Sequence, residues 1–298
     1  MKNILVIGST VVDVIISLSH LPKTGEDVNI YGQSMSLGGC AYNVSDTIRH
    51  FGVPYILFSP TGTGIYADYI RKHLEALRVS SPIPAPSEAN GCCYCLVEDS
   101  GERTFICNRG AEYHFTPKWF SLLDADTIDS VYLCGLEMEE EDNACVLDYL
   151  EQHPEFTVFF APGPHINHLS ESCMNRLFAM NPVIHLNETE VTSYTGESSI
   201  EAAAKALFEK TKNDVIVTLG DKGAYYHTEH ESGCVPSIKC SQIDTIGAGD
   251  SHIGAVISCL KLGDPLPEAI RKANKVSAAV VQNPGAQLPD DVFEAIAF

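Results

Sequence analysis

A short turn in the last quarter of the chain carries the residues best suited to chemistry. Gly247, Ala248 and Gly249 are followed at once by the carboxylate of Asp250, and the next residues have the apolar pattern of a buried helix. The glycines let a backbone approach a ligand closely, and the first N–H groups of a helix attract an anion such as phosphate. A carboxylate beside phosphate is useful if it takes a proton from a hydroxyl that attacks the phosphorus. The other interpretation is a tight strand-to-helix turn in which Asp250 caps the helix.

A second turn of similar character lies in the first quarter of the chain. Gly38 and Gly39 precede Asn43, and a helical pattern follows over 43–51. Paired glycines expose backbone N–H groups and Asn43 adds a side-chain amide, although a loop that only needs positive φ would use the same residues. Two such turns near opposite ends of the chain predict the two halves of one site.

Together the two turns resemble the paired signatures of the ribokinase family, the PfkB-type carbohydrate kinases. Gly-Gly-x-x-x-Asn stands at 38–43 and Asp-Thr-x-Gly-Ala-Gly-Asp at 244–250. Further elements follow in the family's order: a first strand with its aspartate, an Asn-x-x-Glu element, a nucleotide-binding strand and turn, and a C-terminal Gly-Ala-Gln loop. The resemblance covers essentially the whole chain. It implies a kinase that uses ATP and Mg²⁺ to phosphorylate a primary hydroxyl of a small sugar.

The resemblance also implies roles for individual residues. Asp250 would be the general base, and the 247–249 turn would donate N–H groups to the γ-phosphate. The residues expected to contact the sugar are Asp13, Gly38, Gly39, Asn43 and Glu137. Those expected around the nucleotide are Asn187, Thr218, Gly220, Lys222, Gly223 and Asn274. Glu190 would hold Mg²⁺ through its waters, and a monovalent cation such as K⁺ would lie near Asp244, Ile246 and Gly285.

Several of these residues have a structural interpretation beside the functional one. Asp13 suits a solvated strand end, and Glu137 with the acidic run behind it suits the solvated start of a helix. Asn187 and Glu190 have the spacing of a capping box, which is compatible with a role at Mg²⁺. Lys222 is a candidate cation near phosphate and equally a solvated lysine.

Two of the departures from the family pattern are single residues near the glycine turns. His252 stands where an aromatic or small apolar residue usually follows the catalytic turn, and Cys40 replaces the lysine that ribokinases carry after the paired glycines. Neither change touches the base or the anion turn. They weaken any assignment to a particular sugar.

Apolar strand-like runs alternate with helical patterns along the chain. Strands are expected at 4–6, 55–58, 130–134, 157–160, 183–186 and 215–218, and helices at 67–77, 144–151, 200–210 and 268–281. The alternation predicts an α/β fold, a three-layer α/β/α sandwich with a mostly parallel central sheet. The resemblance adds that 1–298 form a single domain with a small β-sheet lid over the sugar. The lid would come from about 12–17, 26–37 and 91–108, the last segment being a hairpin that turns at Ser100 and Gly101.

Composition limits the partners. The 298 residues carry a formal net charge of −20, which disfavours nucleic acid and anionic membranes as partners. No apolar run approaches the ~18–20 residues of a membrane span, and the start of the chain has the pattern of a strand instead of a secretory signal. Eleven scattered cysteines favour a reducing, cytoplasmic environment. The exposed edge of the lid also makes a homodimer plausible.

Two other functions fit the same residues. A nucleoside or pseudouridine kinase is the alternative within the fold, because Tyr31, Tyr94 and Phe105 in the expected lid could stack on a base. A non-catalytic sugar or nucleotide sensor is the alternative from another class, since a fold does not dictate a function. The presence of Asp250 and both glycine turns favours a kinase over a sensor.

Overall fold

An eight-stranded sheet forms the centre of the molecule. The computed structural model describes residues 1–139 and 143–298, and the order of this sheet is β12-β11-β10-β9-β8-β7-β1-β4. The parallel strands are β1 (Asn3–Ile7), β4 (Tyr55–Phe58), β7 (Ile128–Cys134), β8 (Thr157–Ala161), β9 (Val183–Asn187) and β10 (Val215–Thr218). The antiparallel strands β11 (Ala224–His227) and β12 (Ser232–Val235) extend one edge. The predicted mostly parallel sheet is confirmed, and the two edge strands are an addition that the sequence pattern did not indicate.

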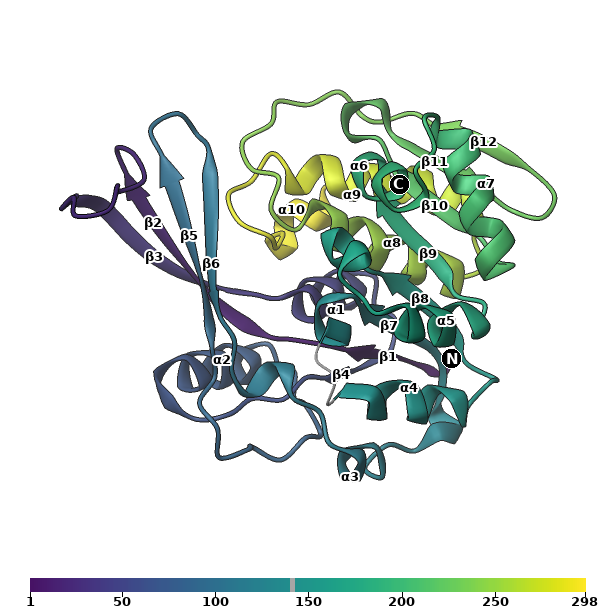
Figure 1. Ribbon diagram of the computed structural model, residues 1–298, viewed down its shortest axis with the longest axis horizontal. Helices are drawn as coiled ribbons and strands as arrows, with labels where there is room; N and C mark the ends of the chain where they lie inside the picture. Colours follow the sequence, from purple (N-terminus) through teal and green to yellow (C-terminus); the bar gives the residue numbers. More distant parts are fainter. Residues whose placement is uncertain (140–142) are drawn as a thin grey trace.

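Helices cover both faces of this sheet (Figure 1). One face shares a core with α1 (Cys40–His50), α2 (Gly64–Ala76), α8 (Ala248–Lys261), α9 (Leu266–Val280) and α10 (Asp290–Glu294). The other shares a core with α3 (Pro117–Phe120), α4 (Ala144–Glu151), α5 (Glu171–Ala179), α6 (Glu188–Thr195) and α7 (Ile200–Thr211). Successive strand residues supply the two cores in turn: Ile4 and Val6 pack on the first side, and Leu5 and Ile7 on the second. The predicted three-layer sandwich is therefore confirmed.

Short 3₁₀ helices complete the connections. They are η1 (Ala111–Tyr113), η2 (Ala125–Thr127), η3 (Leu136–Glu139), η5 (Gly163–Asn167) and η6 (Gly220–Lys222). Three of them follow directly on strand ends of the large sheet: η3 after β7, η5 after β8 and η6 after β10. They therefore lie at the carboxyl ends of parallel strands, the edge at which α/β proteins usually bind ligands.

A second sheet of four strands projects from the body on the left of Figure 1. Its order is β3 (Ile30–Gly38), β2 (Val11–Leu18), β5 (Cys92–Glu98) and β6 (Arg103–Asn108), with β5 and β6 forming the expected antiparallel hairpin. Helix α2 packs against one face of this small sheet, and its Tyr69 hydroxyl donates to the Met35 carbonyl of β3 at 2.7 Å. The strand expected to begin at residue 26 begins at Ile30. The reason is that Glu26 holds a turn, accepting hydrogen bonds from the backbone N–H of Lys23 and from His20.

Helices α1 and α8 pack closely against each other. Each begins at one of the two glycine turns, with Gly39 preceding α1 and Gly247 preceding α8. Where they cross, a Cβ on Gly254 would lie 2.9 Å from the Thr47 Cβ and 3.0 Å from the Val44 carbonyl oxygen. Because only glycine permits this approach, the packing of the two helices fixes the distance between the two turns.

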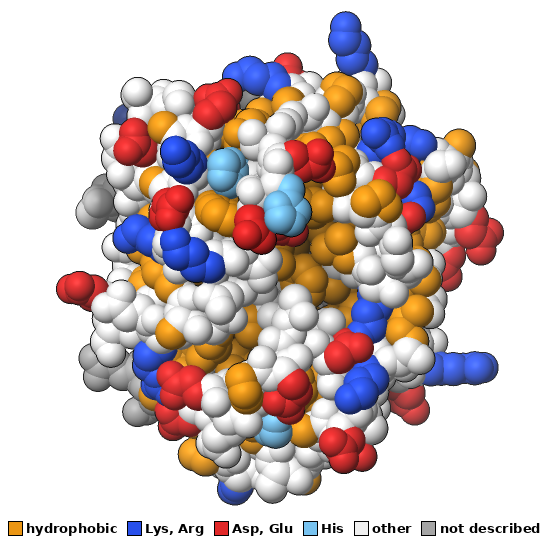
Figure 2. All heavy atoms as spheres, turned by 90° about the vertical axis from the view of Figure 1, so that its right-hand side faces the viewer, with side chains coloured by type: hydrophobic (Ala, Val, Ile, Leu, Met, Phe, Trp, Pro, Cys, Tyr) orange, Lys and Arg blue, Asp and Glu red, His pale blue; other side chains and the backbone are white. Residues whose placement is uncertain are grey.

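The face opposite the small sheet carries charged side chains of both signs (Figure 2). Figure 2 shows acidic and basic side chains interspersed over this side of the molecule. Within the described residues, no helix combines the length and the apolar character needed to cross a membrane.

Candidate active site

The two glycine turns meet at one hydrogen bond. Asn43 Nδ2 donates to Asp250 Oδ2 at 2.8 Å, although the residues are 207 positions apart. Gln287 Nε2 in turn donates to Asn43 Oδ1 at 2.7 Å and to the Leu37 carbonyl at 3.0 Å. Gln287 of the C-terminal loop therefore orients the Asn43 amide, and this amide in turn orients the Asp250 carboxylate.

The turn before α8 has the shape of an anion cradle. Gly247 has φ 73°, and a Cβ there would lie 2.7 Å from the Ala286 Cα, so a side chain is excluded. A Cβ on Gly249 would meet nothing within 4 Å, because Gly249 borders open space. The N–H groups of the first helical turn have no acceptor within the helix and can donate to an anion in that space.

The Asp250 carboxyl is arranged to exchange a proton near neutral pH. Burial raises its pKa to about 6, against the hydrogen bond from Asn43, which lowers it, while the charge of Glu137 adds to the increase. The group is therefore mostly ionised at pH 7 and still basic enough to accept a proton. No hydrogen bond joins the Asp250 side chain to its own helix among those identified in the described residues, so the cap interpretation finds no support.

Asp13 lies on β2 beside the Gly38–Gly39 turn. A Cβ on Gly38 would overlap the Asp13 carboxylate, and one on Gly39, which has φ 95°, would lie 2.5 Å from the Ser9 carbonyl oxygen. Both glycines are thus required for packing. Burial raises the pKa of Asp13 to about 6, so this carboxyl is not an ordinary solvated strand end.

Glu137 is fully buried in η3. The backbone N–H of Ser9 donates to Glu137 Oε1 at 2.7 Å, and burial raises the pKa of the carboxyl. Its other oxygen has no hydrogen-bond partner among the described residues. The interpretation as a solvated helix start is wrong for Glu137, because the side chain lies inside the fold; residues 140–142 of the acidic run lie outside the described residues. A role at the sugar stays a prediction.

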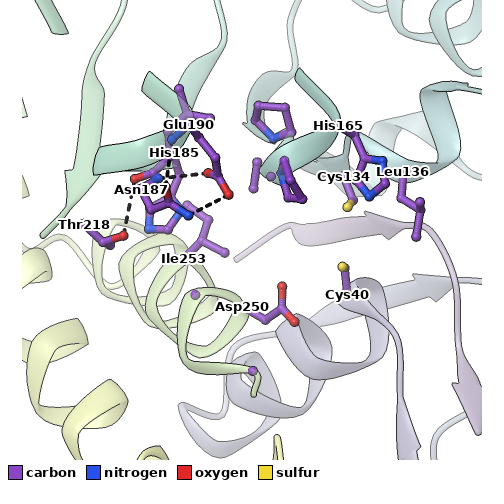
Figure 3. Close-up of a pocket in the computed structure, with 17 residues that line it drawn as sticks. Cys40, Cys134, Leu136, His165, His185, Asn187, Glu190, Thr218, Asp250 and Ile253 are labelled. Atoms are coloured by element: carbon purple, nitrogen blue, oxygen red, sulfur yellow. Dashed lines mark hydrogen bonds between the residues drawn. The ribbon is translucent and has the colours of Figure 1, made fainter. Parts of the chain in front are cut away.

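Asn187 and Glu190 face Asp250 across an inner cavity of about 240 Å³, which Cys40 also lines (Figure 3). The capping box is present: the Glu190 N–H donates to Asn187 Oδ1 at 2.8 Å, and the Asn187 N–H donates to Glu190 Oε2 at 2.9 Å. Burial raises the pKa of Glu190. A carboxylate and an amide oxygen at this wall fit a hydrated Mg²⁺, which keeps most of its waters and takes oxygen ligands.

A larger outer cavity of about 770 Å³ adjoins the inner one through Asn187, Thr218 and Gly249, which line both. Its walls include the predicted nucleotide residues Gly220, Gly223 and Asn274. Lys222 is not among its lining residues. The Lys222 ammonium is exposed and lies 3.7 Å from the Glu188 carboxylate, which matches the interpretation as a solvated lysine.

Asp244 joins the anion turn, the C-terminal loop and the small sheet. Its carboxylate accepts hydrogen bonds from the N–H groups of Ile246 (2.9 Å) and Gly285 (3.0 Å) and forms an ion pair with Arg103 of β6. Burial opposes ionisation, yet these donors hold the pKa of Asp244 below its ordinary value. The residues expected at a monovalent cation are thus together, and the cation itself stays a prediction.

The structure also shows site residues that sequence reasoning did not assign. His252 lines the outer cavity and connects two buried residues: its Nδ1 lies 2.9 Å from His185 Nε2, and its Nε2 lies 3.1 Å from Asn274 Oδ1. Cys134 and Cys40 both line the inner cavity, and their sulfur atoms point toward each other (Figure 3). His252 and Cys40 carried a signal, as departures from the family pattern, and Cys134 carried none.

Comparisons with known proteins agree with this geometry. Residues 1–292 match the model of the pfkB family of carbohydrate kinases. The chain is 32% identical to the uncharacterized sugar kinase YegV of Escherichia coli over 288 residues, which cover 95% of this chain and 90% of that protein.

Solved structures show the same fold. The ribokinase of Thermotoga maritima superposes with a TM-score of 0.85 at 24% identity, with 99% of each chain covered. A nucleoside kinase of Burkholderia thailandensis, in complex with inosine, gives a TM-score of 0.79 at 17% identity, with 98% of this chain and 95% of that chain covered. The resemblance to the ribokinase family is confirmed, and the chain belongs to the pfkB family of carbohydrate kinases.

Proposed function

We propose that the protein transfers the γ-phosphoryl group of ATP to a primary hydroxyl of a small sugar, with Asp250 as the general base. The observation that carries this proposal is the position of the Asp250 carboxylate. It lies in the first turn of α8 and is held at 2.8 Å by Asn43, which follows the Gly38–Gly39 turn. A proton acceptor thus stands between a candidate acceptor site and a candidate phosphate site.

The residues suggest a simple sequence of events. Asp13 and the Asn43 turn would hold the sugar so that its hydroxyl proton points at Asp250. The hydroxyl oxygen would attack the γ-phosphorus, the proton would pass to Asp250, and the bond to the leaving ADP would break. The N–H groups of the 247–249 turn would stabilise charge on the transferred group. Mg²⁺, near Asn187 and Glu190, would neutralise phosphate charge.

A nucleoside acceptor is the second candidate, and one residue favours it. Strand register places Phe105 on the same face of the small sheet as Asp13, and its side chain is 52% exposed and free to stack. Tyr94 is excluded from that role, because its hydroxyl lies 3.2 Å from that of Tyr66 on α2, behind the sheet. The Burkholderia nucleoside kinase shows that this fold can bind inosine.

A substrate screen tests the proposal. Purified protein, Mg²⁺ and ATP would be incubated with a panel of pentoses, hexoses, deoxy sugars and nucleosides, and the phosphorylated product would be identified by mass. A phosphorylated sugar is expected from the wild type and not from Asp250→Asn. A phosphorylated nucleoside would select the second candidate. Absence of ADP and product across the panel, with nucleotide binding intact, would favour a sensor. We also infer a reducing, cytoplasmic setting, because the eleven cysteines are odd in number and scattered along the chain.

A further inference from the structure

Two cysteines of the small sheet lie side by side on the face that carries Asp13. In the strand register, Asp13 of β2 is opposite Cys93 of β5, and Cys93 is opposite Cys107 of β6. Directly paired residues point to the same side of a sheet, so the three side chains form one row. The two sulfur atoms are 3.6 Å apart.

The backbone around this pair suits a disulfide. Opposite residues of antiparallel strands have Cα atoms about 4.5–5.5 Å apart, within the roughly 4.4–6.8 Å that a disulfide spans. The sulfurs need to approach by only about 1.5 Å to reach bonding distance, which side-chain rotation can supply without moving the strands. Cys107 is exposed and Cys93 is partly exposed, so small reagents can reach both.

We propose that Cys93 and Cys107 are a modification site, at which peroxide converts the two thiols into a reversible disulfide beside Asp13. The Cys107 sulfur attacks the O–O bond of hydrogen peroxide, which gives a sulfenic acid and one water. The Cys93 sulfur then attacks the sulfenic sulfur, the S–O bond breaks, and a second water leaves with the Cys93 proton. Two thiols are oxidised, one peroxide is reduced, and a dithiol reductant reverses the change.

The order of the two steps follows from the surroundings of each thiol. Burial raises the pKa of the Cys93 thiol, and the neighbouring Cys107 and Asp13 raise it further. Cys93 is therefore a poor first nucleophile, since the thiolate is the reactive form. The exposed Cys107 is the site of first attack, and Cys93 is the resolving partner.

The expected effect on catalysis rests on the proposed function. The row places the cysteines next to Asp13, the carboxylate proposed to bind the acceptor. Neither cysteine lines the outer cavity, which is proposed to bind the nucleotide. Oxidation should therefore raise the KM for the acceptor by about tenfold, the size of one lost hydrogen bond. The KM for ATP should stay unchanged.

A peptide map tests the chemistry without reference to activity. Reduced full-length protein would be treated with hydrogen peroxide, blocked with iodoacetamide and digested with trypsin without reductant. Cleavage after Arg78, Arg103 and Arg109 separates the two cysteines, so the disulfide would join peptide 79–103 to peptide 104–109. The linked mass is expected in the wild type, and dithiothreitol should remove it.

Matched variants assign the bond. Cys93→Ser and Cys107→Ser should each abolish the linked mass, although Cys92 and Cys95 remain in the same peptide. Cys234→Ser, which removes an exposed thiol on β12, should leave it unchanged. A wild type that keeps both thiols, or over-oxidises Cys107 without forming the link, would overturn the proposal; so would a link that persists in Cys93→Ser. A linked mass in a protein that phosphorylates nothing would leave the modification standing and refute the kinase assignment alone.

Discussion

Asp250 and Asn43 share one hydrogen bond of 2.8 Å, through which the last quarter of the chain contacts the first. If Asp250 is the base, Asp250→Asn removes the proton acceptor and keeps the shape of the side chain. We expect kcat to fall by at least ~10²-fold, while the Kd for ATP measured by calorimetry stays within about twofold. The control is Asp68→Asn, which changes an exposed carboxylate on α2. Near-normal turnover in Asp250→Asn would refute the base assignment.

The pH dependence of kcat/KM should report the raised pKa of this carboxyl. Because the pKa of Asp250 is about 6 in the folded protein, the group gains a proton and loses its function as pH falls through 6. The value of kcat/KM should fall about tenfold per pH unit below pH 6 and stay constant above pH 7. Asp13 has a similar pKa of about 6. If activity requires both carboxylates to be ionised, kcat/KM should fall about a hundredfold per pH unit below pH 6. Asp13→Asn should leave only the slope due to Asp250, and a profile that is level from pH 5 to 8 would contradict both assignments.

Gln287 should matter for rate although it lies outside both cavities. Gln287→Ala removes the donor that holds Asn43 Oδ1 at 2.7 Å, so the Asn43 amide loses its fixed orientation toward Asp250. We expect kcat to fall about tenfold, the size of one hydrogen bond, with thermal stability little changed. Asn283→Ala is the matched control, because its amide bonds only the Ala279 carbonyl among the interactions identified in the described part of the chain. Equal kinetics for the two variants would mean that Gln287 has no positioning role.

His252 should affect nucleotide binding more than turnover. Burial lowers the pKa of His252 to about 4, so the ring is neutral at pH 7. Its hydrogen bond at 3.1 Å fixes Asn274, which lines the outer cavity and whose amide donates to the Val235 and Pro236 carbonyls. His252→Phe should raise the KM for ATP about tenfold and change kcat little, while His252→Gln should retain part of the function. His230→Gln changes an exposed histidine and serves as the control.

A homodimer through the small sheet stays a prediction. Ile30 and Tyr31 on the edge strand β3 are exposed, and an edge strand offers unpaired backbone groups to a partner. Sedimentation should give twice the 32.4 kDa mass of the chain, and Ile30→Lys should shift it to the monomer. A wild type that sediments as a monomer at high concentration would exclude this interface.

Local sequence patterns were sufficient for most of the fold. The buried parallel strands are continuous apolar runs, and the glycine turns are marked by residue types that no regular element uses. β11 (Ala-Tyr-Tyr-His) and β12 (Ser-Gly-Cys-Val) were missed because small and polar residues interrupt them, so neither has the continuous apolar run of the equally short β4 and β10. The apolar pattern therefore predicts the layers and the buried parallel strands, whereas the order of strands in the sheet and the two antiparallel strands come from the structure.

The candidate site was predictable where motifs mark its residues, as at the two glycine turns, and unpredictable where no motif marks the residues that meet. Arg103 and Asp244 are 141 positions apart and have no periodic relation, so nothing in the sequence pairs them. Lys222 was left open between a phosphate contact and a solvated lysine because a motif does not say which way a side chain points, and its role at phosphate stays a prediction. Glu137 was left open between two roles because burial is a property of packing, not of local sequence.

The contact of α1 and α8 at Gly254 has a consequence for how such proteins diversify. The proposed proton acceptor and phosphate cradle lie at the start of α8, which packs against α1 in the interior, whereas Asp13, Phe105 and the thiol pair lie on a peripheral sheet. Substitutions in that sheet can retune which molecule is accepted while the reacting centre keeps its alignment. New preferences can thus arise at the periphery with little loss of catalytic power.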